Sequence, residues 1–177
     1  KDKMGMMPQF SPDGTVVFMR MGLDWSFPKL MKVKIDGGEV SNIFNDSEKL
    51  EMYPKISPDG KYLAYVSFFS DKAVNQVKMK IKVVEFAESK VGNEIFEKDI
   101  EQVTRFAWTP DSQNLVYLEP NKKTNLINLS IPDKKEWNIT DFNSKTMEGS
   151  FTIGKDGKTI YAVRSSDSRE LVLIKSE

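Results

Sequence analysis

Side chains that could do chemistry in this chain are limited to carboxylates, amines, guanidinium groups, hydroxyls and aromatic rings. The 177 residues include 26 Lys and Arg and 26 Asp and Glu, but no histidine and no cysteine. The chain therefore offers no Ser-His-Asp triad, no thiolate nucleophile and no zinc site of the usual type. No local spacing pairs two carboxylates as a glycosidase requires. We predict no catalytic residue, no cofactor and no metal ligand here, although a calcium ion held by carboxylates and carbonyls is compatible with the composition.

Charge and hydropathy exclude two kinds of partner. The formal net charge is 0, whereas a protein that grips phosphate backbones carries a basic patch, so we expect no nucleic acid. No run approaches the roughly 18 apolar residues of a membrane-spanning helix, so we expect a chain that does not span a membrane. Lys78, Lys80 and Lys82 alternate with apolar residues. This pattern predicts the solvated face of an outer strand.

The candidate binding residues are charged and aromatic side chains that fall in or next to predicted loops: Asp24, Trp25, Phe27, Tyr53, Asp71, Arg105 and Glu148. The aromatic residues of the short loop 21–28 either fold back onto the strands or are offered to a partner. The loop 68–76 is the longest of its kind, which favours exposure. Arg105 and Glu148 either belong to a solvated rim or bind an anionic ligand or peptide terminus.

A repeated turn specifies the elements that must position these residues. Phe-Ser-Pro-Asp-Gly at 10–14 recurs as Ile-Ser-Pro-Asp-Gly at 56–60, and more loosely at 108–112 and 153–157, at intervals of 46, 52 and 45 residues. Ser-Pro-Asp-Gly favours a type I turn, with glycine free to adopt the left-handed conformation. Apolar runs flank every copy, so each turn joins two strands of a hairpin. The turn aspartates are predicted to cap backbone amides rather than to catalyse: Asp13, Asp59, Asp111 and Asp156.

Units of about 45 residues with four antiparallel strands predict an all-β chain of β-propeller blades. We place about four blades in one partial domain covering 1–177, with approximate limits 4–48, 49–101, 102–144 and 145–177. A β-sandwich would not repeat the same turn at near-constant spacing. The fourth unit ends after its third strand, so we expect a ring of six to eight blades, completed by the same polypeptide or a second chain. A closed four-bladed ring is the alternative.

The Ser-Pro-Asp-Gly turns, together with segments 35–39 and 138–142, resemble the WD40-like repeats of TolB-like propellers. They are also similar to the propeller domains of prolyl-oligopeptidase-type peptidases. Segment 167–175 is similar to the C-terminal end of TolB-like propellers. The resemblance implies a non-enzymatic module that binds a protein or peptide, in the periplasm or outside the cell. The alternatives are the substrate-gating propeller of a larger serine peptidase, and a C-terminal sensor domain of a multidomain enzyme.

Overall fold

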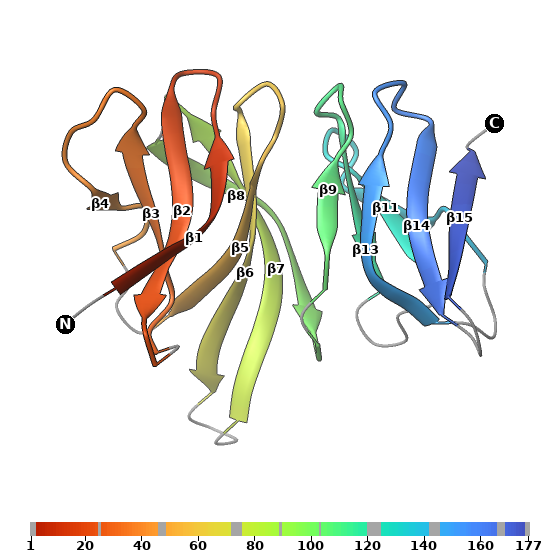
Figure 1. Ribbon diagram of the computed structural model, residues 1–177, viewed down its shortest axis with the longest axis horizontal. Coiled ribbons are helices and arrows are strands. Elements are labelled where there is room, and N and C mark those ends of the chain that lie inside the picture. Colours follow the sequence, from red (N-terminus) through yellow and green to blue (C-terminus); the bar gives the residue numbers. More distant parts are fainter. Residues whose placement is uncertain are drawn as a thin grey trace. The chain divides into compact units, whose positions relative to one another are not determined.

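The computed structural model describes residues 3–24, 26–45, 49–71, 76–88, 90–102, 104–119, 125–141, 146–165 and 169–175. These residues form fifteen β-strands in four antiparallel sheets (Figure 1), so the all-β prediction is confirmed. Within these ranges there is no helix long and apolar enough to cross a membrane. The chain divides into two compact units, Lys1–Ile100 and Glu101–Glu177.

The first unit contains two four-stranded sheets, each with its strands in chain order. The first sheet consists of β1 (Lys3–Phe10), β2 (Thr15–Gly22), β3 (Lys29–Lys34) and β4 (Ser41–Asn42). The second sheet consists of β5 (Leu50–Ile56), β6 (Tyr62–Asp71), β7 (Gln76–Ala87) and β8 (Lys90–Ile100). Each sheet is the up-and-down meander of one propeller blade.

The second unit contains one four-stranded and one three-stranded sheet. The third sheet consists of β9 (Phe106–Trp108), β10 (Asn114–Leu118), β11 (Leu126–Ser130) and β12 (Lys135–Asn138). The fourth sheet consists of β13 (Thr146–Ile153), β14 (Thr159–Ser165) and β15 (Arg169–Lys175). The predicted end of the fourth blade after its third strand agrees with this sheet.

The repeated turns have the backbone conformation predicted from their sequence. The last turn residue is left-handed, with φ of 77° at Gly14, 76° at Gly60 and 68° at Gly157. Ser112 takes this place in the third copy with φ of 62°, a conformation that costs a residue with a side chain about 1–2 kcal/mol. Each turn thus returns the chain to an antiparallel neighbour.

The turn aspartates cap backbone amides, as predicted. In each copy the Oδ1 atom accepts a hydrogen bond from the N–H two residues later, at 3.0 Å for Asp13, 3.1 Å for Asp59, 2.9 Å for Asp111 and 3.0 Å for Asp156. A further bond from the Thr109 hydroxyl is the main cause of the lowered pKa of Asp111. These carboxylates are occupied by the turns that they stabilise.

Each unit has its own core. In the first unit, Val17, Met19 and Leu30 of the first sheet are at most 1% exposed. They form one apolar cluster with five buried residues of the second sheet: Ile56, Leu63, Tyr65, Val84 and Phe86. In the second unit, a cluster joins residues of the third sheet to Ile160 and Ala162 of the fourth sheet. Burial of this apolar surface is the main stabilising contribution within each unit.

The first and fourth sheets each leave one apolar face exposed. On the first sheet, Phe10 is 65% exposed and Ile35 is 68% exposed. On the fourth sheet, Leu171 is 76% exposed, Leu173 is 51% exposed and Tyr161 is 43% exposed. Both faces lie opposite the faces that form the cores described above.

The prediction that three lysines lie on a solvated face holds for Lys78, which is exposed, but is wrong for the other two. Lys80 and Lys82 lie on β7, the third strand of its sheet, where β8 covers them with carboxylates. Their side chains are only 21% and 15% exposed, and they form ion pairs with Glu97 and Glu94 at 2.5 Å. The pattern on β7 placed the lysines on one face correctly, but it carried no information about the acidic residues of β8.

Candidate functional site

The loop between β2 and β3 is held by hydrogen bonds at both of its ends. The Gly22 N–H donates to the Ser26 carbonyl at 3.0 Å. Asp24 Oδ1 accepts bonds from the Ser26 hydroxyl at 2.5 Å and the Ser26 N–H at 3.2 Å. The Pro28 carbonyl accepts a bond from the Glu51 N–H at 3.1 Å. The loop is therefore fixed to its own blade and to the next one.

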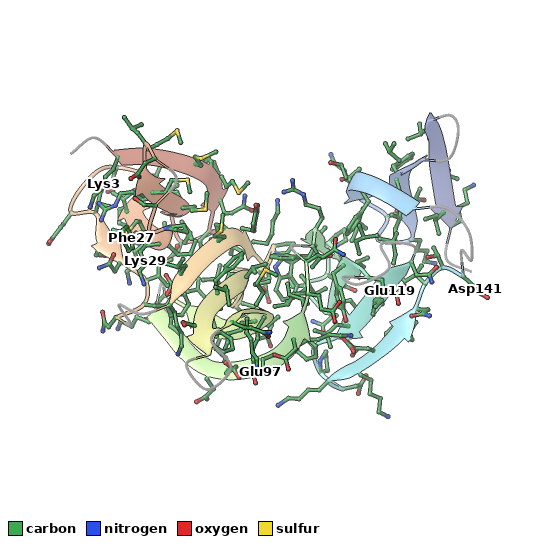
Figure 2. All side chains as sticks on the ribbon, turned by 90° about the horizontal axis from the view of Figure 1, so that it is seen from below. Lys3, Phe27, Lys29, Glu97, Glu119 and Asp141 are labelled. Carbon is green, nitrogen blue, oxygen red and sulfur yellow. The ribbon has the colours of Figure 1, made fainter. Side chains whose placement is uncertain are left out.

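A pocket of about 790 Å³ lies against this loop at one end of the first sheet. Lys3, Phe27 and Lys29 are gathered at this end (Figure 2). The residues that line the pocket come from all four strands and the loop: Lys3, Arg20, Met21, Gly22, Leu23, Asp24, Ser26, Phe27, Lys29 and Asn42. We call it the first-blade pocket. Its volume falls in the range of about 300–1,000 Å³ that is typical of ligand sites.

Register explains why three cations share this pocket. Arg20 pairs with Gly5 on one side and with Lys29 on the other, so both basic side chains lie on the same face. Lys3 is two residues from Gly5 on β1 and therefore shares that face. Like charges placed directly opposite each other repel, and an anion between them relieves the repulsion.

The single acidic residue in the lining, Asp24, offsets only one of these three positive charges. Hydrogen bonds from the Ser26 hydroxyl, and then from its N–H, lower the Asp24 pKa, so the carboxylate is ionised at neutral pH. Within the described part of the chain, the side chains of Lys3 and Arg20 form no hydrogen bond or ion pair, while Lys29 Nζ donates to the Lys49 carbonyl. The lining therefore retains an excess of positive charge.

Two apolar side chains are exposed beside this charge. Phe27 is 76% exposed and Leu23 is 61% exposed. Phe27 has a φ of 51°, which is uncommon for an aromatic residue. Of the two arrangements left open by the sequence, the phenylalanine adopts the exposed one. Apolar and aromatic anchors of this kind are common where a protein holds a partner.

The other predicted site residues do not line this pocket. Tyr53 lies in β5, at a bulge in its pairing with β6, with a φ of 58°. Arg105 is exposed in the second unit, just before β9. Trp25 and the side chains of Asp71 and Glu148 lie outside the described residues. The structure thus brings Asp24 and Phe27 together and gives the remaining predictions no common site.

Glu51 is a supporting residue that the sequence did not reveal. Its side chain is buried, with the residue 2% exposed, and Oε2 accepts a bond from the Leu30 N–H at 3.3 Å. Ile43, the residue after the short β4, donates to the carbonyl of Leu30 at 3.0 Å, and Glu51 takes up the N–H of the same residue. In the third sheet the Thr140 hydroxyl accepts the equivalent bond from the Leu126 N–H at 2.9 Å. Because Glu51 sits between Leu50 and Met52, alternation alone predicts that it is exposed.

Among the described residues no group of three or more acidic side chains converges to hold a cation. The chemistry of the first-blade pocket is instead that of anion binding, because one guanidinium and two ammonium groups outnumber its one carboxylate.

No protein-family model matches this sequence. No curated protein matches it either. Solved structures do match. The chain is similar to an oligogalacturonate lyase in complex with manganese, with a TM-score of 0.70, 16% identity and coverage of 98% of this chain and 49% of that chain. It is also similar to a puromycin-hydrolysing peptidase of Mycobacterium tuberculosis, with a TM-score of 0.72, 11% identity and coverage of 97% and 29%.

A third similar structure comes from a study of two prolyl endopeptidases, with a TM-score of 0.65, 14% identity and coverage of 98% of this chain and 28% of that chain. At these identities the likeness concerns the fold alone. The chain spans about half or less of the length of these proteins. Together with the four blade-like sheets, the comparisons show that the chain is a section of a β-propeller.

Proposed function

We propose that this chain is a non-enzymatic section of a β-propeller that binds an acidic segment of a peptide or protein partner. The observation that carries the proposal is the first-blade pocket, where Lys3, Arg20 and Lys29 outnumber the single carboxylate of Asp24. A guanidinium group binds a carboxylate through two parallel hydrogen bonds, which gives orientation as well as attraction. Phe27 and Leu23 supply apolar contact beside the charge.

The pocket is tested by fluorescence anisotropy with a labelled peptide that alternates glutamate with leucine, and with its glutamine counterpart. We expect the glutamate peptide to bind at least about tenfold more tightly, a difference of roughly 1.4 kcal/mol. Added salt should weaken the binding, since the cations are partly exposed.

Arg20→Gln and Phe27→Ala should each weaken the binding of the glutamate peptide. Lys90→Gln removes an exposed charge on β8 and serves as the matched control. Equal binding of the two peptides, or equal effects of Arg20→Gln and Lys90→Gln, would contradict the proposal.

A second candidate is the substrate-gating propeller of a larger serine peptidase. The similarity to prolyl endopeptidase and puromycin-hydrolysing peptidase structures favours it. The test begins with the intact mass of the natural polypeptide and its sequence beyond this segment. The natural protein is then treated with a fluorophosphonate, which labels an active-site serine covalently. A Gly-x-Ser-x-Gly segment with a distant histidine, and covalent labelling, would support this candidate over the first.

The TolB-like relationship and a location in the periplasm or outside the cell belong to the same proposal. The repeated Ser-Pro-Asp-Gly turns support the relationship. Fractionation of cells that produce the natural protein tests the location. Recovery in the cytoplasmic fraction would contradict it.

A further inference from the structure

A second pocket, of about 430 Å³, lies entirely within the second unit, between the third and fourth sheets. Its floor consists of aliphatic side chains: Val116, Ile139, Ile153, Ile160 and Ile174. Its polar residues include Asp111, Asn114, Asn128, Lys158 and Lys175, and Trp137 supplies an aromatic ring. We call it the second-unit pocket. An apolar floor with a few convergent polar groups is typical of sites for small molecules.

Trp137 lies on β12, the edge strand of the third sheet, directly opposite Asn128 on β11. The tryptophan is 50% exposed. Burial of an indole ring is strongly favourable, and a half-exposed ring on a pocket wall still has surface to bury. A ligand that stacks on the ring would bury it. Register places the neighbouring amide of Asn128 on the same face of the sheet.

Asn128 and Asn114 form an amide pair in this pocket. Asn128 is only 6% exposed, and its Nδ2 donates to Asn114 Oδ1 at 2.9 Å. Within the described residues this bond leaves the Asn128 amide oxygen and the Asn114 amide nitrogen without a side-chain or backbone partner. A buried amide that keeps an unused acceptor is costly unless something in the pocket binds it.

The charged groups at the rim of the second-unit pocket differ in the hydrogen bonds that they already make. The Asp111 carboxylate already accepts bonds from the Thr109 hydroxyl and the Gln113 N–H. Lys158 and Lys175 come from the fourth sheet and its turn, and both are exposed. The rim therefore offers the ammonium group of Lys175, while the amide pair offers one donor and one acceptor.

We propose that the second-unit pocket binds a hexopyranose ring, either as a single sugar or as the end of an oligosaccharide. One face of a pyranose consists of C–H groups, which match the indole of Trp137 and the aliphatic floor. Its hydroxyls both donate and accept, which matches the free acceptor of Asn128 and the free donor of Asn114. This inference is independent of the first-blade pocket, because no residue is shared by the two linings.

Saturation-transfer NMR on the whole 177-residue chain tests the proposal with glucose, galactose, N-acetylglucosamine and glucuronate as probes, and adenosine as the competing ring. We expect at least one sugar to show saturation transfer with a dissociation constant on the order of 1 mM. Transfer should be strongest at the C–H groups of one ring face. Saturation transfer by none of the sugars, or by adenosine alone, would overturn the proposal.

Substitutions then locate the site. Trp137→Ala should weaken sugar binding at least about tenfold, and Trp137→Tyr, which keeps a ring, should weaken it less. Phe27→Ala in the first-blade pocket is the matched control and should leave sugar binding unchanged. Far-ultraviolet circular dichroism checks that each variant folds. Binding that survives both Trp137 substitutions, or that is lost in Phe27→Ala, would overturn the assignment to this pocket.

Discussion

The turn glycines Gly14 and Gly60 have nearly the same backbone conformation, but the atoms around them differ. A Cβ atom added at Gly14 would lie 3.6 Å from Ile35 Cγ2, an ordinary contact. A Cβ atom added at Gly60 would lie 2.9 Å from Pro12 Cδ and 3.1 Å from Ser11 Oγ. The second turn therefore packs against the first one, and Gly60 is required for space as well as for its positive φ.

Gly14→Ala and Gly60→Ala should consequently differ in stability. Both substitutions force a side chain into the left-handed region, which costs about 1–2 kcal/mol. Gly60→Ala must in addition displace the neighbouring turn, so we expect it to lose roughly another 1 kcal/mol or more. Urea unfolding of the two variants and the unchanged chain measures the difference. Equal losses of unfolding free energy in the two variants would show that packing between the two turns does not restrict Gly60.

At the scale of the element, β7 and β8 are joined by a ladder of ion pairs. Lys80 contacts Glu97 at 2.5 Å and Asp99 at 3.8 Å, and Lys82 contacts Glu94 at 2.5 Å and Glu97 at 3.1 Å. Hydrogen bonds from the lysines lower the pKa of Glu97. Burial alone would lower the pKa of Lys82, but its bonds to Glu94 and Glu97 outweigh this effect and raise it.

The ladder should make stability depend on pH at both ends of the range. Because the Glu97 pKa is lowered on folding, its stabilising contribution is present above the ordinary glutamate pKa of 4.5 and is lost as the pH falls through the folded value. Because the Lys82 pKa is raised, its contribution is complete below 10.5 and is lost as the pH rises through the folded value.

Glu97→Gln should therefore destabilise the chain at pH 7 by less than about 1 kcal/mol, and hardly at all near pH 3. Glu88→Gln, on the exposed turn between the same strands, is the control and should change little at either pH. Urea unfolding at the two pH values provides the comparison. A loss for Glu97→Gln that is the same at both would exclude the ladder as its cause.

The sequence predicted the elements better than it predicted their contacts. The repeated turn carries its own conformational preference in Pro12, Asp13 and Gly14, so hairpins and blade spacing could be read from local residues. The partial burial of Lys80 and the full burial of Glu51 depend on partners about 17 and 21 residues away, Glu97 and Leu30. Alternation assigns a side chain to a face but does not say what covers that face.

The candidate site could be predicted only in part, because local sequence indicates loop residues but not the strands that pair beside them. Asp24 and Phe27 are predicted site residues because they lie in a short loop. Arg20 and Lys29 join them only through the pairing of β2 with β3. The second-unit pocket depends on the pairing of Asn128 with Trp137 and on residues of the fourth sheet. No spacing in the sequence indicates that combination.

At the scale of the whole molecule, the exposed faces of the first and fourth sheets have buried equivalents elsewhere in the chain. The N–H of the first turn residue bonds to the carbonyl of Thr15 in the first sheet and of Tyr62 in the second. Val16 and Phe18 are therefore equivalent to Leu63 and Tyr65, which are buried in the core of the first unit. A partial propeller of this kind implies completion by other parts.

The chain studied alone should accordingly self-associate. Exposed apolar patches on both terminal sheets favour contact with any similar face, and the extent should rise with protein concentration. Sedimentation velocity over a range of concentrations measures it. Ile35→Glu and Leu171→Glu should reduce association, whereas Val77→Glu, at an exposed residue of β7 away from these faces, should not. A chain that remains monomeric at every concentration would contradict this expectation.

The contact between successive turns also bears on how such a chain grows in evolution. Gly60 faces Pro12 in the first unit, and Gly157 faces Pro110 in the second. The first two copies, 10–14 and 56–60, each carry both halves of the joint, a proline for the copy that follows and a glycine for the copy that precedes, whereas the third copy keeps only the proline and the fourth only the glycine. Tandem duplication of the first or the second copy inserts a module whose two ends already fit. Gene duplication can thus lengthen the chain by one blade without any compensating mutation at this joint.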